Sequence, residues 1–184
     1  SGSIACVYRA TLRSGAEVAV KLRRPAIAQT MAADLALLRG GAAMIARLPV
    51  LRGTPVRELV DQVCDAVLRQ LDFEREAADL ERLRCNLATV PRVRVPRIHR
   101  AQCRATSIVM DLIPDLDATS AGRCGTADRR AFATATLAVV YQMLFVDGFV
   151  HCDLHPGNLY FTAAGRVVVL DAGFSVQLED RMRR

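Results

Sequence analysis

The chain has 184 residues, an apolar fraction of 52% and a net charge of +6. This length suits one domain, or two small lobes that share a cleft, and excludes several independent domains. The arginines are scattered and no aromatic-rich platform accompanies them, so we expect no nucleic-acid partner, whereas an anionic membrane surface fits the charge. The six cysteines form no C-x-x-C pair and no secretory signal opens the chain, which predicts a reducing, cytoplasmic location.

The first part of the sequence predicts a β-hairpin and then a helix. Residues 4–23 hold two stretches with alternating apolar positions around Ser14 and Gly15, a turn dipeptide. Pro25 opens a helical segment that extends to about Leu48, although two glycines interrupt it.

A second helical segment is predicted over residues 54–87. Thr54 is its expected N-cap, and Pro55 its first helical residue. The apolar stripe rotates midway, which predicts a bend. The residues expected to be buried are Val56, Val60, Val63, Val67 and Leu71 in the first half, and Phe73, Leu80, Leu83 and Leu87 in the second.

Glu76 lies on the apolar stripe of this second segment, three residues after Phe73 and four before Leu80. A carboxylate in that position requires a cation. The alternative is that the side chain reaches solvent or pairs with a neighbouring arginine.

The rest of the chain predicts short strands around one apolar helix. Residues 91–98 and 107–115 are rich in β-branched side chains and punctuated by proline, and the second stretch leads into a candidate hinge. An apolar helix is expected over residues 127–147; its uncharged run is too short to span a membrane, so we expect a buried core helix. Strands are expected at residues 159–161 and 166–170.

A pattern typical of phosphoryl transfer follows the apolar helix. His151, Asp153 and Asn158 form H-x-D-x-x-x-x-N, and Asp171 ends the strand thirteen residues after Asn158. Transfer from ATP needs oxygen ligands for Mg²⁺ and a carboxylate that orients the acceptor, so Asn158 and Asp171 suit the metal and Asp153 suits the acceptor. The alternative for the segment H-C-D-L-H is a zinc cluster of a hydrolase.

Lys21 is the only lysine in the sequence, whereas arginine occupies the other 24 basic positions. It ends the segment V-A-V-K on the second predicted strand. A slim ammonium suits a buried contact with phosphate, and Glu76 on a separate helix would fix it. The pattern therefore predicts an ion pair between Lys21 and Glu76.

At these motifs the chain resembles the UbiB family of atypical kinases, also called the AarF or ADCK type. The residues that carry the resemblance extend over nearly the whole chain. They are SGSIACVYRATLRSGAEVAVKLRRPAI, LDFEREAADLERL, VRVPRI, IVMDLIPD, GFVHCDLHPGNLYF and GRVVVLDAGF.

The resemblance implies an α+β fold of the protein-kinase-like, two-lobed type, truncated at both ends. Residues 1–113 would form the N-lobe with inserted helices and hinge, and residues 114–184 a partial C-lobe. The implied activity is that of an ATP-dependent kinase or ATPase that uses ATP and Mg²⁺. The family supports ubiquinone or other isoprenoid-lipid metabolism, so isoprenoid lipids, quinone-biosynthesis proteins and the inner face of a membrane are implied partners.

The resemblance also assigns roles to individual residues. Lys21 and Glu76 would be the ion pair and Asp153 the catalytic aspartate, with Asn158 and Asp171 as the magnesium ligands. The nucleotide-binding residues would be Ser1, Gly2 and Ser3 in the phosphate loop, Lys21, and the backbone from Asp111 to Ile113 around adenine.

The chain departs from the family pattern in three places. Gln70 stands where a glutamate is usual, Ala172 replaces the phenylalanine of D-F-G, and the usual alanine-rich nucleotide loop reads Ser-Gly-Ser at residues 1–3. Gln70 and Ala172 motivate one alternative, a non-catalytic pseudokinase that binds nucleotide and serves as a scaffold. The other alternative is a phosphotransferase of the aminoglycoside- or choline-kinase type, because H-x-D-L-H-P-G-N occurs there too; the D-F-E-R-E-A helix favours the UbiB type.

Overall fold

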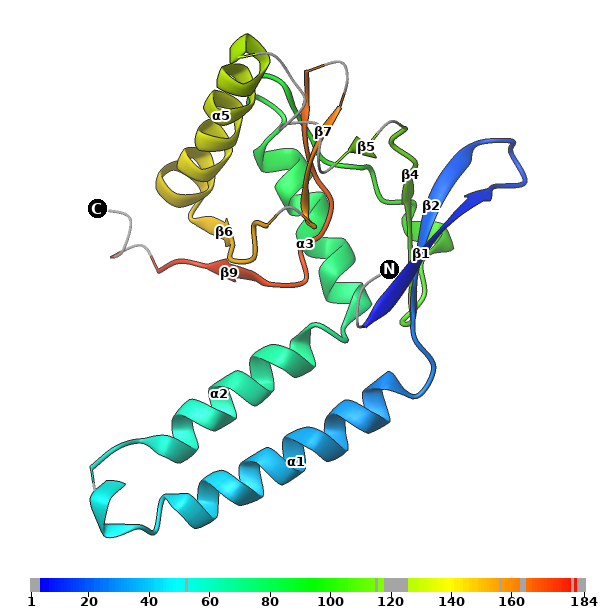
Figure 1. The fold of residues 1–184 in the computed structure, drawn as a ribbon. Coiled ribbons are helices and arrows are strands. Elements are labelled where there is room, and N and C mark those ends of the chain that lie inside the picture. Colours follow the sequence, from blue (N-terminus) through cyan, green and yellow to red (C-terminus); the bar gives the residue numbers. More distant parts are fainter. Residues whose placement is uncertain are drawn as a thin grey trace.

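In the computed structural model, small β-sheets and helices form a body from which two long helices project (Figure 1). The structure describes residues 4–51, 53–114, 116–117, 126–155, 157–162, 165–179 and 181. The elements in chain order are β1 (Ala5–Thr11), β2 (Glu17–Arg23), α1 (Ile27–Ile45), η1 (Pro49–Leu51), α2 (Val56–Arg69), α3 (Phe73–Asn86), β3 (Val93–Arg94), η2 (Arg100–Gln102), β4 (Ser107–Asp111), β5 (Leu116–Asp117), α5 (Thr126–Tyr141), η3 (Gln142–Asp147), β6 (Phe149–His151), β7 (Leu159–Thr162), β8 (Val167–Val169) and β9 (Ser175–Gln177).

The predicted N-terminal hairpin is confirmed and forms a sheet with the later strand β4. The sheet order is β1-β2-β4, with both pairs antiparallel. Gly15 takes a φ of 87° in the turn, a backbone conformation that glycine adopts without strain. Lys21 pairs with Val7 on one side and Ile108 on the other. The lysine therefore lies on the central strand, where its backbone is held from both sides.

Helices α1 and α2 form an antiparallel pair that projects from the body (Figure 1). α1 continues through both glycines, as a single helix. The prediction of Thr54 as an N-cap was wrong: α2 begins at Val56, and no side chain caps it. Instead the N–H of Val56 donates to the carbonyl of Thr54 at 2.8 Å, which makes a tight turn just before the helix.

The burial pattern of α2 also differs from the prediction. Val63 is 55% exposed, whereas its neighbour Cys64 is fully buried and its thiol faces the Leu35 carbonyl of α1. Because α2 packs mainly on α1, it buries a single narrow line of side chains and leaves the adjacent valine in solvent. The two helices consequently expose apolar residues that a helix within the body would cover.

The helix predicted over residues 54–87 is interrupted rather than bent. α2 ends at Arg69, and α3 begins at Phe73 after an N-cap at Asp72, whose carboxylate accepts from the backbone N–H of Arg75 at 3.0 Å. Aspartate is a favoured N-cap, and it restarts the helix with a new direction. In α3 the predicted core residues Phe73, Leu80 and Leu83 are buried.

A second sheet has the strand order β3-β8-β7-β5 (Figure 1). The strands at residues 159–161 and 166–170 are confirmed as β7 and β8. The stretch 91–98 forms a strand only over β3, because its prolines lack the N–H that a sheet ladder needs. The short strands β5, β6 and β9 were not predicted.

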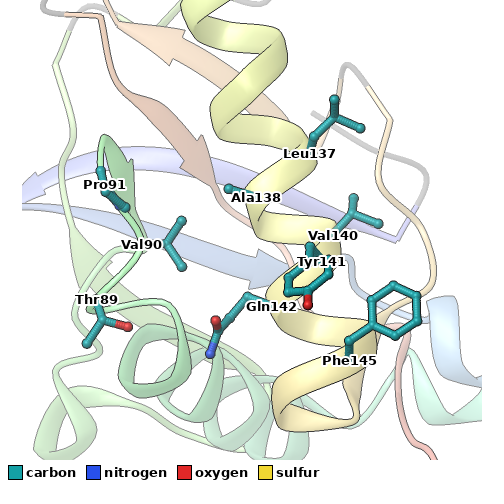
Figure 2. Close-up of a pocket in the computed structure, with 9 residues that line it drawn as sticks. All are labelled: Thr89, Val90, Pro91, Leu137, Ala138, Val140, Tyr141, Gln142 and Phe145. Carbon is teal, nitrogen blue, oxygen red and sulfur yellow. The ribbon is translucent and has the colours of Figure 1, made fainter. Parts of the chain in front are cut away.

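The apolar segment 127–147 is helical, but only one face is buried. Phe132, Val139 and Met143 face the core, whereas Leu137 is 69% exposed. The segment is thus part of the core, as predicted, but only through one side of α5 and η3. On the other side lies an apolar pocket of about 650 Å³ (Figure 2). In the described part of the chain, no helix is long and apolar enough to cross a membrane.

Leu80 should be a major contributor to stability. Its side chain is fully buried in the main hydrophobic core, so we expect Leu80→Ala to lower the free energy of unfolding by about 2–5 kcal/mol. Leu37→Ala is the matched control, because that leucine is 76% exposed and should change stability by about 0.5 kcal/mol or less. Urea unfolding followed by circular dichroism measures both; equal losses would contradict the placement of the core.

Candidate active site

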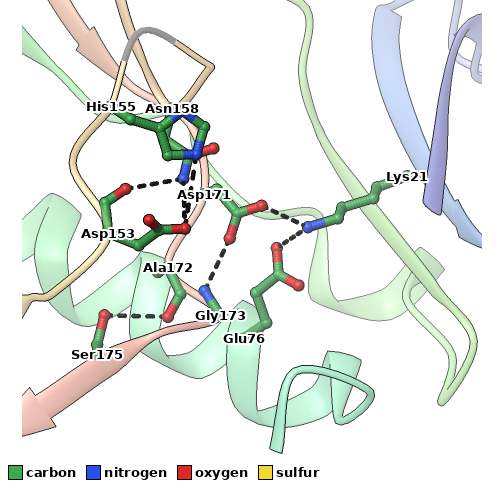
Figure 3. Close-up of polar contacts among 9 residues, drawn as sticks. All are labelled: Lys21, Glu76, Asp153, His155, Asn158, Asp171, Ala172, Gly173 and Ser175. Carbon is green, nitrogen blue, oxygen red and sulfur yellow. Dashed lines mark hydrogen bonds and ion pairs between the residues drawn. The ribbon is translucent and has the colours of Figure 1, made fainter. Parts of the chain in front are cut away.

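Lys21 joins two carboxylates that are far apart in the sequence. Its Nζ lies 2.5 Å from Oε1 of Glu76 on α3 and 2.8 Å from Oδ2 of Asp171, which follows β8 (Figure 3). The ammonium also lies 5.4 Å from the ring centre of Phe73. The predicted pairing of Lys21 with Glu76 is present in the structure, and Asp171 is a second partner that the sequence did not indicate.

Local structure explains why Glu76 reaches Lys21. The cap at Asp72 fixes the start of α3, so Phe73 and Glu76, three residues apart, lie on the same helix face. Phe73 packs in the core, and the Glu76 side chain is only 2% exposed. Core packing therefore fixes the position of the Glu76 side chain, which would be mobile on the surface.

The three charged groups have different proton affinities. Burial raises the pKa of Glu76 to about 7, although the Lys21 ammonium opposes this shift. Burial also disfavours the charged forms of Asp171 and Lys21, but attraction between opposite charges outweighs burial. Lys21 therefore lowers the pKa of Asp171, and the two carboxylates raise the pKa of Lys21. Lys21 and Asp171 thus remain charged near neutral pH.

Asp171 is oriented through both of its carboxylate oxygens. Oδ2 accepts a hydrogen bond from Nζ of Lys21, and Oδ1 accepts one from the backbone N–H of Gly173 at 2.8 Å. The intervening Ala172 is fully buried, and its carbonyl accepts the hydroxyl of Ser175 at 3.0 Å (Figure 3). The segment that replaces D-F-G is therefore fixed by hydrogen bonds.

The predicted catalytic loop faces the same space. Asn158 donates from Nδ2 to the Asp153 carbonyl at 2.9 Å and lies 3.4 Å from the Asp153 carboxylate. Because its amide nitrogen is used in this way, the amide oxygen of Asn158 is left as a possible ligand. The carbonyl of Asn158 also accepts the N–H of Leu170 at 3.0 Å, which links the loop to the segment that carries Asp171.

The two histidines of H-C-D-L-H are engaged separately. His151 is buried, its Nδ1 accepts the N–H of Asp153 at 3.1 Å, and burial lowers its pKa so that the ring is neutral. His155 accepts the N–H of Gly157 instead. Within the described residues, no three His, Cys, Asp or Glu side chains are grouped to hold a metal, so the structure gives the zinc-cluster alternative no support.

A cavity of about 630 Å³ brings the predicted residues together. It is lined from the hairpin sheet, from α3, and from the loops around β7 and β8. Among the predicted site residues, its walls include Lys21, Glu76, Asp111, Ile113, Asp153, Asn158 and Asp171. The predicted phosphate loop at Ser1, Gly2 and Ser3 lies outside the described residues.

Two histidines to which the sequence assigned no role lie at the cavity or next to one of its lining residues. His99 places Nε2 2.9 Å from Oδ1 of Asp111 at the end of β4, beside the cavity. His155 lies beside Asp153, with 3.5 Å between Nε2 and the carboxylate. The sequence could have indicated His155 through its place in the H-C-D-L-H motif. No sequence pattern indicated His99, because its partner Asp111 lies on a different segment.

Comparison with known proteins gives the family. A model described as the ABC1 atypical kinase-like domain matches residues 1–184. The chain belongs to this family. The resemblance to UbiB proteins is confirmed by a probable protein kinase UbiB of Pseudomonas aeruginosa, 31% identical over 98% of this chain and 35% of the relative.

Two further similarities support the family and its fold. An uncharacterised protein of Mycobacterium tuberculosis is 34% identical, over all of this chain and 38% of the relative. The solved complex of Rv3197 with erythromycin, from the same organism, aligns with a TM-score of 0.81 and 26% identity over 97% of this chain and 45% of that one. The α+β kinase-like fold is therefore confirmed. The chain spans less than half the length of these ABC1 relatives.

The raised pKa of Glu76 predicts how stability depends on pH. In the unfolded chain this carboxyl has a pKa near 4.5, against about 7 in the fold, so between these values the folded state binds more protons. Ionisation of Glu76 therefore lowers stability as the pH rises. Between about pH 5 and pH 8, we expect the free energy of unfolding of the wild type to fall by about 2–3 kcal/mol relative to that of Glu76→Gln.

Urea unfolding of both proteins at several pH values measures this difference. The lowered pKa of His151 affects both proteins, so its contribution cancels in the comparison. Glu81→Gln, a substitution on the same helix, is the control variant. If the difference in free energy of unfolding between the wild type and Glu76→Gln does not change with pH, the result would contradict the burial of an ionisable carboxyl.

Proposed function

We propose that the chain binds ATP with Mg²⁺ in the cavity and promotes transfer of the terminal phosphoryl group to an acceptor hydroxyl or to water. The observation that carries the proposal is the convergence of Lys21, Glu76 and Asp171 with Asp153 and Asn158 on one cavity. Residues 1–113 would form one lobe and residues 114–184 part of the other.

The donor set of the cavity fits these ligands. Asp171 and the amide oxygen of Asn158 are hard oxygen ligands of the kind that Mg²⁺ prefers, and the phosphates would complete its coordination. Bound there, Mg²⁺ would neutralise charge on the phosphates. Lys21 supports the proposal because a buried ammonium held by two carboxylates can contact α- and β-phosphates without leaving its strand.

The remaining residues suit nucleotide and acceptor. The backbone from Asp111 to Ile113 lies at the end of β4, at the cavity wall, and would bind adenine. Asp153 is half-exposed, and among the described residues no side chain bonds its Oδ1. That oxygen would accept the proton of the acceptor as the bond from phosphorus to the leaving oxygen breaks and the bond to the acceptor forms.

Asp153→Asn tests the enzymatic part of this proposal. We expect kcat for magnesium-dependent ATP hydrolysis to fall by about 10²–10⁴-fold, because the amide cannot accept the proton, while nucleotide affinity is unchanged. Asp65→Asn, a change of an exposed aspartate on α2, should leave both values as in the wild type. Hydrolysis is followed by phosphate release and affinity by calorimetry.

A nucleotide-binding pseudokinase scaffold is the second candidate, and Ala172 in place of phenylalanine favours it. The same assay distinguishes the two. Wild-type protein that binds ATP with Mg²⁺ but shows no turnover with any acceptor or water would support the scaffold and overturn the enzyme.

We also propose a role in ubiquinone or other isoprenoid-lipid metabolism, at the cytoplasmic face of a membrane. Family membership and the UbiB relative support the metabolic role. The tip of the α1–α2 pair supports the membrane: residues 42–57 contain three arginines and no acidic residue, and Met44 and Val50 are 71% and 85% exposed. Exposed apolar side chains among basic ones favour an anionic lipid surface.

Vesicle binding tests the membrane contact. We expect the protein to cosediment with phosphatidylcholine vesicles that contain phosphatidylglycerol, and less so at high salt, because screening weakens the arginine contacts. Val50→Asp should reduce binding several-fold. Leu137→Asp, on an exposed leucine of α5, is the matched control. Equal binding of both variants would place any membrane contact elsewhere.

A further inference from the structure

His155 lines the cavity beside Asp153, yet the proposed function gives it no part. Its ring is about half-exposed, and Nε2 is 3.5 Å from Oδ2 of Asp153 (Figure 3). This separation is too long for a good hydrogen bond. A donor on Nε2 would therefore be available to another group in the cavity.

The hydrogen-bond network assigns the proton to Nε2. The backbone N–H of Gly157 donates to Nδ1 at 2.9 Å, so the lone pair of Nδ1 is already used. A neutral imidazole carries one proton, and it must then lie on the other nitrogen. The loop thus directs the Nε2–H of His155 toward the Asp153 carboxylate and the cavity.

The glycine at position 157 is needed for this ring placement. A Cβ at that position would lie 2.5 Å from Cε1 and 2.9 Å from Nδ1 of His155, closer than such atoms approach. The imidazole therefore folds back over its own loop because residue 157 has no side chain. His155 provides the ring, and Gly157 leaves the space that the ring occupies.

The charges around the cavity indicate what the donor serves. Four carboxylates, from Glu76, Asp111, Asp153 and Asp171, line the cavity together with one ammonium. Lys21 is held by two of them, Glu76 and Asp171. Phosphoryl transfer gathers charge on the equatorial oxygens of the transferring group, which would lie next to the acceptor that Asp153 orients. A fixed neutral donor at that place stabilises this charge without adding to the carboxylate repulsion.

We propose that His155 is a catalytic residue whose Nε2–H donates a hydrogen bond to an oxygen of the transferring phosphoryl group. This inference rests on the proposed function and adds the residue that contacts the terminal phosphate beside Asp153. The donor is the Nε2–H group, because Nδ1 of the same ring accepts the backbone N–H of Gly157.

His155→Leu removes the donor and His155→Gln retains one, since the glutamine amide nitrogen reaches about as far as Nε2. We expect kcat to fall by about 10²–10³-fold for the leucine variant and by much less for the glutamine variant. Gly157→Ala should displace the ring and lower kcat similarly, and the double change with His155→Leu should add little. Leu137→Ala is the control and should behave as the wild type.

Binding of ADP with Mg²⁺, with and without aluminium fluoride as a mimic of the transferring group, gives a readout independent of turnover. We expect aluminium fluoride to tighten ADP binding in the wild type and in His155→Gln, and to have little effect in His155→Leu, while affinity for ADP alone is the same in all three. Equal tightening in the leucine variant, in a protein that turns over ATP, would overturn the role of His155 and leave the proposed function intact. No ADP binding by the wild type would overturn both.

Discussion

The contact between Lys21 and its two carboxylates is the interaction on which the candidate site depends. It joins the central strand of the hairpin sheet, the first turn of α3 and the segment after β8. A buried charge that loses its partner costs several kcal/mol, so each of the three groups constrains the other two. The sheet, the helix and the C-terminal segment can then hold only a narrow range of relative positions around the cavity.

The two carboxylates on Lys21 are not equivalent. Glu76 is surrounded by core side chains, so burial dominates and raises its pKa to about 7. Asp171 is one-third exposed and also accepts the Gly173 N–H, so its pKa is lowered. Both carboxylates line the cavity, but Asp171 is the more exposed of the two, whereas Glu76 is buried and changes its charge near neutral pH.

Most of the site was readable from the sequence because its residues sit at fixed places on local elements. Alternation placed Lys21 on a strand, helical spacing placed Glu76 on a buried face, and both are found there. The contact of Lys21 with Asp171 was not readable, since it joins residues that lie 150 positions apart on different elements. The exposed Val63 was misjudged for a related reason: periodicity gives a face, but only the neighbouring elements decide whether that face is covered.

Alanine at position 172, in place of the phenylalanine of D-F-G, leaves Asp171 held in position. The missing ring would have packed against neighbouring elements, yet Asp171 is positioned by other means: the Gly173 N–H, the Lys21 ammonium and the Leu170 N–H that bonds Asn158. The alanine itself is fully buried, and Ser175 holds its carbonyl. Because these bonds arise mostly from the backbone, they do not depend on the size of the side chain at position 172. The substitution therefore removes packing area near the site without removing any group that fixes the direction of Asp171.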